Sequence, residues 1–256
     1  MNTTTFIFDG SLEGLLTAVF ESYDRKLWPD NICTQANFHP IMFCEPTEIV
    51  SDTAKAQRVW NGLTKKLSAD GCNLVYYVYL SELPESPLLI LSFIRKVFQV
   101  KHNIEQDFGD ETVLRMWQIG KKVARESQRV KMFLRFQKTG DGIYYASFDP
   151  EYNVLALSVN HFKDRFADQR WVIYDTRRNI GFYYDLNEVS EVSFTESRVN
   201  FATGKLDNEI LDKDELLFQQ LWKTYFKEME IKERHNYKLH RQLMPKRFWK
   251  YLIEKN

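Results

Sequence analysis

The sequence predicts an α+β protein with a helical N-terminal lobe, a central antiparallel sheet and long basic helices packed around that sheet. Apolar residues recur at helical spacing over much of the first 108 residues and again near the C-terminal end. Between residues 140 and 194 the pattern changes to short β-type runs separated by turns. We therefore expect two lobes, residues 1–108 and 109–256, which could also form one continuous domain.

Local signals give the elements of the N-terminal lobe. Asp9-Gly10 is a turn dipeptide that follows a β-type run, and Ser11 can cap the next helix. Gly71 is typical of a helix end and Pro87 of a helix start. The expected elements are a strand at residues 5–8, helices at residues 11–25, 51–71 and 87–98, an extended stretch up to residue 43, and a segment at residues 74–83 that fits either a strand or a helix.

The rest of the chain combines long helices with a series of strands. Residues 110–128, or a longer stretch that continues past residue 128, form the clearest helix, with apolar side chains on one side and cations on the other. Because short connections join the strands that follow, we expect an antiparallel meander. One C-terminal helix runs over residues 217–243 and ends at Met244-Pro245. The expected strands lie at residues 143–148, 154–159, 171–174, 180–184 and 189–194, with a short helix at residues 161–167.

Composition excludes several classes of protein. With 19 Phe, 13 Tyr and 6 Trp, the chain needs a core or binding surfaces to cover its aromatic rings, which excludes intrinsic disorder. Ten Gly and seven Pro in 256 residues exclude collagen-like sequence. Thirty-five Lys and Arg balance 35 Asp and Glu. This zero net charge argues against coating nucleic acid by bulk charge, but it leaves local basic patches possible.

The cysteines and the N-terminal sequence indicate a cytoplasmic location. Cys33, Cys44 and Cys72 are widely spaced and odd in number, which is typical of reduced thiols rather than of a disulfide framework. The first residues lack the pattern of a signal peptide, and no apolar run is long enough to span a membrane. We expect no metal site and no cofactor, because no metal-ligand spacing or phosphate-loop, dinucleotide, hydrolase or deaminase motif occurs.

Two basic segments are the strongest functional signal. Residues 115–138 hold eight Lys and Arg against one acid, and residues 223–256 hold ten against four. Cations on outer helix faces can neutralise phosphates, and aromatics such as Phe248, Trp249 and Tyr251 can stack on unpaired bases. Alternatively, the cations only solvate the helices, or they pair with the acidic residues 185–215. The predicted nucleic-acid-binding residues are Lys122, Arg125, Arg129, Arg234, Lys238, Arg241, Lys246, Arg247 and Trp249.

Two smaller groups are weaker candidates for a site. His161, Arg165 and Asp168 follow at i, i+4 and i+7, where an imidazole and a carboxylate could perform acid–base chemistry. The alternative is a set of hydrogen-bonding residues on a helix that packs on the sheet. Asp9 and Glu13 could form an acidic site, although turn formation and helix capping explain them better. His235 and His240 are five residues apart, so they do not share a helix face as metal ligands.

Several stretches together resemble a bacterial family described as DNA metabolism or DNA repair proteins, a domain of otherwise unknown function. The stretches are FDGSLEGLLTAVF at residues 8–20, KMFLRF at 131–136, NHF at 160–162, RFADQ at 165–169, WVIYD at 171–175, ERHN at 233–236, KLH at 238–240 and MPKRFW at 244–249. Some members of that family are joined to a uracil-DNA glycosylase domain. Stand-alone members are associated with a radical-SAM protein that resembles spore photoproduct lyase. The resemblance therefore implies a role in DNA repair, but it carries over no catalytic residues.

Three hypotheses follow. The first is a DNA-binding accessory protein that binds damaged or single-stranded DNA and presents it to a separate enzyme in repair or modification. The second is an enzyme that acts on a nucleic-acid base and uses His161 and Asp168. The third is an adaptor whose basic faces bind an acidic partner, such as a radical-SAM protein.

Overall fold

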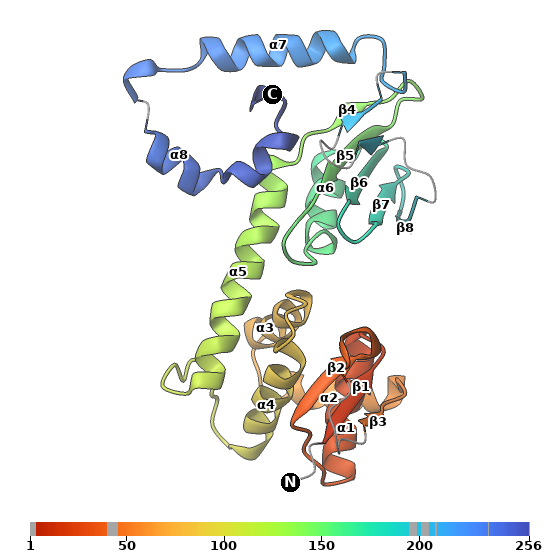
Figure 1. Ribbon diagram of the computed structural model, residues 1–256, viewed down its shortest axis with the longest axis vertical. Helices are drawn as coiled ribbons and strands as arrows, with labels where there is room; N and C mark the ends of the chain where they lie inside the picture. Colours follow the sequence, from red (N-terminus) through yellow and green to blue (C-terminus); the bar gives the residue numbers. More distant parts are fainter. Residues whose placement is uncertain are drawn as a thin grey trace. The chain divides into compact units, whose positions relative to one another are not determined.

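The computed structural model describes residues 4–39, 46–194, 199–200, 205–207, 209–234 and 236–255. Helices and strands are mixed, which confirms the predicted α+β class (Figure 1). The chain divides into two compact units, residues 1–124 and residues 125–256, and each is described by itself. The division falls within the helix α5, Glu111–Phe133. The expected boundary between residues 108 and 109 stays a prediction.

The first unit contains a parallel sheet of three strands in the order β2-β1-β3. The central strand β1, Thr5–Phe8, pairs on one side with β2, Asn31–Thr34, and on the other with β3, Pro46–Glu48. All four residues of β1 are buried. This burial explains its uninterrupted apolar run, because a central parallel strand is covered on both faces.

Four helices of the first unit start at side-chain caps or at a proline. Ser11, Asp52 and Ser68 each accept a hydrogen bond from the backbone N–H three residues later, and Pro87 lies in the first turn of the fourth helix. The caps therefore determine where the chain turns into helix. The helices are α1 at Leu12–Asp24, α2 at Thr53–Thr64, α3 at Ala69–Leu80 and α4 at Ser86–Gln99.

The single helix expected at residues 51–71 is wrong, because α2 and α3 are separate. The carboxylate of Glu105 accepts hydrogen bonds from the backbone N–H and the hydroxyl of Ser68, so a new helix starts there. Gly71 lies in the first turn of α3 and not at a helix end. A Cβ on Gly71 would lie 2.8 Å from the Glu105 carboxyl carbon, so the glycine makes room for this contact. The ambiguous segment at residues 74–83 is mostly helical.

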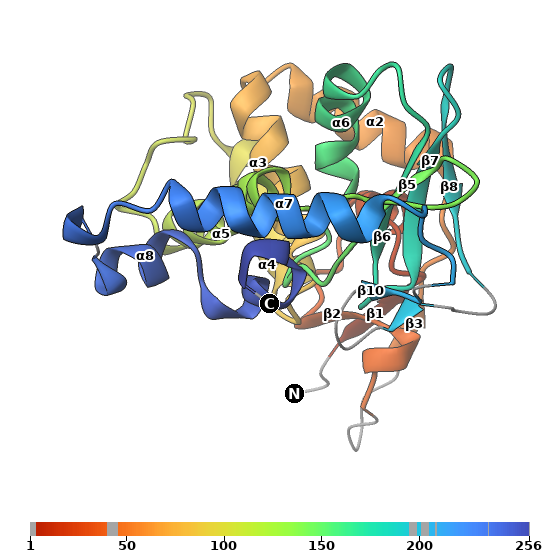
Figure 2. The same cartoon turned by 90° about the horizontal axis from the view of Figure 1, so that it is seen from above.

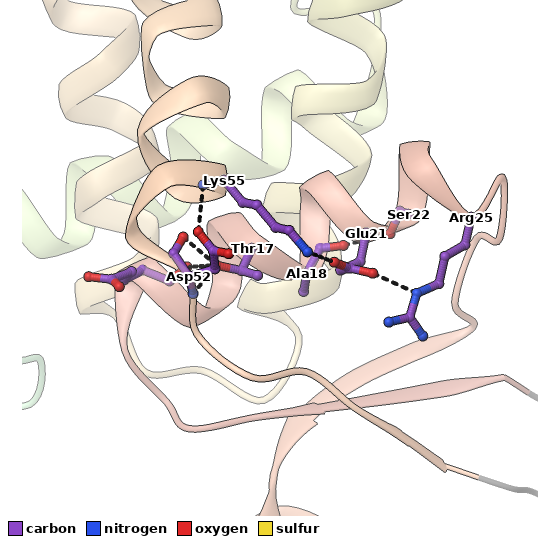
Figure 3. Close-up of polar contacts among 8 residues, drawn as sticks. Thr17, Ala18, Glu21, Ser22, Arg25, Asp52 and Lys55 are labelled. Carbon is purple, nitrogen blue, oxygen red and sulfur yellow. Dashed lines mark hydrogen bonds and ion pairs between the residues drawn. The ribbon is translucent and has the colours of Figure 1, made fainter.

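Polar contacts join α1 to α2 (Figure 3). The backbone N–H of Asp52 donates to the Thr17 hydroxyl at 3.1 Å. The Glu21 carboxylate lies 2.6 Å from the Lys55 ammonium and 2.5 Å from the Arg25 guanidinium. The Glu21 side chain is buried, and the hydrogen bond from Lys55, followed by that from Arg25, lowers its pKa below the ordinary value of 4.5. Glu21 therefore stabilises the first unit in its ionised form.

We expect Glu21→Gln to lower the free energy of unfolding by about 1 kcal/mol at neutral pH, because both cations lose their charged partner while remaining partly solvated. The folded-state pKa lies below the unfolded-state pKa, so this stabilisation is present above about pH 4.5 and is lost as the pH falls further. Urea unfolding at neutral pH and near pH 3.5 tests this. A difference between wild type and variant that does not shrink in acid contradicts the assignment.

The second unit contains a five-stranded sheet in the order β4-β5-β6-β7-β8. Its strands are β4 at Gln137–Lys138, β5 at Tyr144–Phe148, β6 at Trp171–Asp175, β7 at Ile180–Tyr184 and β8 at Val189–Val192. The central strand β6 is buried along its whole length. In both views β5, β6 and β7 lie side by side, and α6 at Val159–Arg165 lies beside them (Figures 1 and 2). A separate antiparallel pair joins β9 at Val199–Asn200 to β10 at Lys205–Leu206.

The expected antiparallel meander is wrong at one pair, because β5 and β6 run parallel. The chain crosses from the end of β5 to the start of β6 through α6, and such a crossover returns the chain in the same direction. The other pairs of this sheet are antiparallel. The strand expected at residues 154–159 is wrong as well. Residues 156–158 form a 3-10 turn, η2, that leads into α6.

The C-terminal segment is not the single long helix expected at residues 217–243. It comprises α7 at Glu215–Glu228, a 3-10 turn η3 at Lys232–Arg234, and α8 at Tyr237–Leu243. Asn236 starts α8 anew, because its side-chain oxygen accepts from the backbone N–H of Leu239 at 3.0 Å. Two further 3-10 turns follow, η4 at Lys246–Tyr251 and η5 at Ile253–Lys255.

Candidate nucleic-acid interface

Two aromatic residues of η4 belong to the core of the second unit. Phe248 and Tyr251 are buried, and the Phe248 ring stacks on Phe148 with ring centroids 5.1 Å apart. Phe133 packs at 5.4 Å from the same ring. Burial raises the pKa of Tyr251, since the phenolate would have little water around it. The prediction that Phe248 and Tyr251 stack on bases is therefore wrong, because both rings belong to the core of the second unit.

Arg247 and Arg129, two of the predicted binding residues, neutralise a buried carboxylate. The Glu126 side chain is only 1 % exposed, and it pairs with the Arg247 guanidinium and, at 3.5 Å, with Arg129. The backbone N–H of Glu151 donates to Glu126 at 3.1 Å, and the Glu151 carboxylate lies 3.3 Å from Arg247. A buried carboxylate is stable only when it is paired and hydrogen-bonded. These two arginines thus have a structural role before any role in binding.

Trp249 differs from its neighbours because it is only half-buried. Its indole N–H donates to the carbonyl of Met244 at 3.1 Å, which fixes the orientation of the ring. The ammonium groups of Lys246 and Lys255 lie 6.0 Å and 5.8 Å from the ring centroid, and the His240 ring lies at 5.8 Å. This arrangement surrounds a partly accessible aromatic face with cationic and titratable groups.

Six of the predicted cations are exposed, and no ion pair joins them to a carboxylate among the residues that the structure describes. Lys122 and Arg125 belong to α5, and the others belong to or adjoin η3, α8 and η4. The last four lie within thirteen residues of the chain, close in sequence to Trp249. The six cations are Lys122, Arg125, Arg234, Lys238, Arg241 and Lys246.

The acidic segment at residues 185–215 does not neutralise these cations within the described part of the chain. Asp212 pairs with Lys138 at 3.2 Å, and Glu215 accepts from the backbone N–H of Lys138 at 3.1 Å. Asp185 accepts from the backbone N–H groups of Glu188 and Asn187, and these bonds lower its pKa. Glu196 lies outside the described residues. Asp212 and Glu215 therefore hold the edge strand β4, and Asp185 closes a local turn.

The candidate group on and just after α6 does not form an enclosed site with shared contacts. His161, Arg165 and Asp168 are all exposed, and no hydrogen bond or ion pair joins the three in the described structure. The helix is anchored by Phe162 instead, which is buried and packs on Trp171 with ring centroids 6.3 Å apart. The structure thus gives the imidazole and the carboxylate neither a shared partner nor a buried environment.

Asp9 has the turn and capping role. Its carboxylate accepts from the backbone N–H and hydroxyl of Ser11 and from the hydroxyl of Ser51 at 2.7 Å. Although burial raises the pKa of Asp9, these hydrogen bonds outweigh it and lower the pKa. Glu13 binds the Thr53 hydroxyl at 2.7 Å. The two acids therefore join β1 and α1 to the start of α2.

The described residues contain no group of three or more His, Cys, Asp or Glu that is placed to hold a metal ion. Cys33 and Cys72 are buried and reduced, whereas Cys44 and His235 lie outside the described residues. Of the helices that the structure describes, none combines the length and apolar character needed to cross a bilayer.

Two residues of this region, Lys255 and Glu126, are not among the binding residues predicted from the sequence. Lys255 was not singled out, although its ammonium lies near Trp249 and 4.8 Å from the centroid of the Phe226 ring. Spacing gives no signal for it, since the contact depends on how the C-terminal turns fold back. The role of Glu126 did have a signal, because it is the one acid among the eight cations of residues 115–138.

Comparison with known protein families places most of the C-terminal two thirds of the chain in a family of unknown function. A family model described as a domain of unknown function, DUF4130, matches residues 84–254, which is more than half of the chain. No curated protein and no solved structure matches the chain significantly.

Proposed function

Because the chain belongs to the DUF4130 family, whose function is unknown, we propose its function from its own surface: it binds single-stranded DNA and presents it to a separate enzyme in DNA repair or modification. The observation that carries this proposal is a set of exposed cations close to Trp249 in the sequence, of which Lys246 also lies over its ring at 6.0 Å; none of them has a carboxylate partner among the described residues. The set is Arg234, Lys238, Arg241 and Lys246.

Two physical arguments favour a single strand. Exposed cations bind phosphates with little regard to sequence, whereas an aromatic face can stack only on a base that is not already stacked in a duplex. Trp249 is the half-buried aromatic of η4, whose other rings, Phe248 and Tyr251, are buried. The resemblance to DNA repair proteins favours DNA as the nucleic acid and a radical-SAM protein as the separate enzyme.

Fluorescence anisotropy with a labelled oligo-dT strand tests the proposal. Replacing Arg234, Lys238 and Arg241 by Ala should weaken binding about tenfold or more at low salt and should reduce the slope of log affinity against log salt by about two. A matched control replaces Lys65, Lys101 and Lys213, which are also exposed, and removes the same charge. Equal losses in the two triple variants would indicate bulk attraction, and absence of wild-type binding at low salt would overturn the proposal.

Substitutions of Trp249 test the stacking part of the proposal in the same binding assay. Trp249→Ala should lower the affinity for the single strand by about fivefold to a hundredfold, while Trp249→Phe keeps most of it, because one stacked base contributes about 1–3 kcal/mol. A duplex of the same length should bind both variants equally. Circular dichroism shows whether either variant has lost structure.

A further inference from the structure

A pocket of about 290 Å³ lies between α3 and α5 within the first unit (Figure 1). Leu74 of α3 and Gly120 of α5 give it apolar surface. A Cβ on Gly120 would lie 2.5 Å from the Leu74 Cδ1 atom, so the glycine lets the two helices approach closely here. Pockets for drug-sized ligands have roughly 300–1,000 Å³. This pocket therefore has room for a single ring-sized group.

Two aromatic side chains, Trp117 and Tyr77, line the pocket and are partly buried. The indole N–H of Trp117 donates to the carbonyl of Glu105 at 2.6 Å. The Trp117 ring also packs edge-on against Phe108, with ring centroids 6.1 Å apart. A ring that is already held in place loses little conformational freedom when a ligand stacks on it. The pocket is therefore suited to a flat aromatic ligand.

The polar groups of α3 that line the pocket are Asp70 and Asn73. Both side chains are exposed, lie one turn apart on the same side of the helix, and have no hydrogen-bond or ion-pair partner among the described residues. Asp70 is not needed as a helix cap, because the Ser68 hydroxyl accepts from the backbone N–H of Gly71 and donates to Glu105. The carboxylate of Asp70 and the amide of Asn73 are therefore available to a ligand.

We propose that this pocket binds a guanine base. The Watson–Crick edge of guanine presents two adjacent N–H donors beside one oxygen acceptor, whereas each of the other three DNA bases presents a single donor group there. A carboxylate can accept from both donors, and an amide N–H can donate to the oxygen, so Asp70 and Asn73 together match this edge. The base stacks on the aromatic side chains of Trp117 and Tyr77.

Two lysines of α5, Lys121 and Lys122, supply positive charge for the phosphate of the same nucleotide. Lys121 lines the pocket, and its ammonium lies 5.9 Å from the centroid of the Trp117 ring. Both lysines are exposed and have no carboxylate partner in the described part of the chain. The guanine can belong to a free nucleotide or to a single DNA strand, and the second source rests on the proposed function.

NMR titration with the four deoxynucleoside monophosphates, followed at the indole N–H signal of Trp117, tests the proposal. Trp117→Phe assigns that signal. Deoxyguanosine monophosphate should bind about fivefold or more tightly than the other three, because a bidentate match discriminates bases by at least that factor. Asp70→Asn should abolish the preference, since an amide keeps only one of the two acceptor oxygens. The matched control, Asp24→Asn, removes the same charge from an exposed position on α1 and should keep the preference.

A second titration compares oligo-dT with the same strand carrying one central guanine. A preference for the guanine strand that Asp70→Asn removes assigns the pocket to single-stranded DNA, whereas a preference among the monophosphates alone assigns it to a free nucleotide. Absence of monophosphate binding, equal binding of all four, preference for another base, or a guanine preference that survives Asp70→Asn would overturn the proposal. Because the monophosphates bind without a strand, failure of oligo-dT binding and failure of the guanine pocket are read separately.

Discussion

Phe248→Ala is expected to lower the free energy of unfolding by about 3–5 kcal/mol. The ring is completely buried and lies between Phe148 and Phe133, so its removal leaves a cavity that rigid neighbouring rings cannot fill. Chemical denaturation followed by circular dichroism measures this loss. If the two units unfold in separate transitions, the loss should appear in one of them only.

Trp249→Ala is the matched control for this prediction, since it removes an adjacent large aromatic from the same 3-10 turn. Its ring is only half-buried, and we expect a loss of about 1–2 kcal/mol. An equal loss in both variants would contradict the assignment of Phe248 to the core and of Trp249 to the surface. This difference also matters for DNA binding, because only the Trp249 variants can report on it without large changes in stability.

The different environments of Phe248 and Trp249 show which features of η4 can be predicted from the sequence and which cannot. Interleaved cations and aromatics predicted that this segment contacts nucleic acid, but the same alternation anchors a 3-10 turn. Phe248 and Tyr251 are three residues apart, the spacing at which side chains of a 3-10 helix align. Arg247 and Lys250 share the same spacing and pair with Glu126 and Asp149. The sequence therefore contains the three-residue spacing of the inward face of η4, although a search for α-helical periodicity does not detect it.

The fold class and most helices followed from periodicity and caps, whereas strand direction did not. The turn signals around β5 and β6 indicated an antiparallel meander, yet the short helix expected between them was itself evidence for a parallel crossover. The separation of α2 from α3 depends on Glu105, which lies 37 residues after Ser68. No local pattern contains such a contact, so Gly71 was interpreted as a helix end.

Arg247→Ala is expected to lower the free energy of unfolding by about 2–3 kcal/mol. It leaves the buried Glu126 carboxylate with Arg129 alone, at 3.5 Å, and with the backbone N–H of Glu151. Because Arg247 is itself one-third exposed, we place the loss below that of a fully buried pair. Urea unfolding of the single variant measures it, with Lys246→Ala as the matched control, since that neighbouring cation has no carboxylate partner in the described structure.

Adding Glu126→Gln to Arg247→Ala should recover most of the lost stability, because a neutral amide no longer needs the arginine while its oxygen still accepts from Glu151. The two substitutions are therefore expected to couple by about 1–3 kcal/mol, and strictly additive losses would show that Arg247 does not stabilise the carboxylate. The double variant also separates structure from binding. If Arg247 contacts DNA as well, the stable double variant should still bind the oligo-dT strand more weakly than Glu126→Gln alone, whereas a purely structural arginine leaves the two affinities equal.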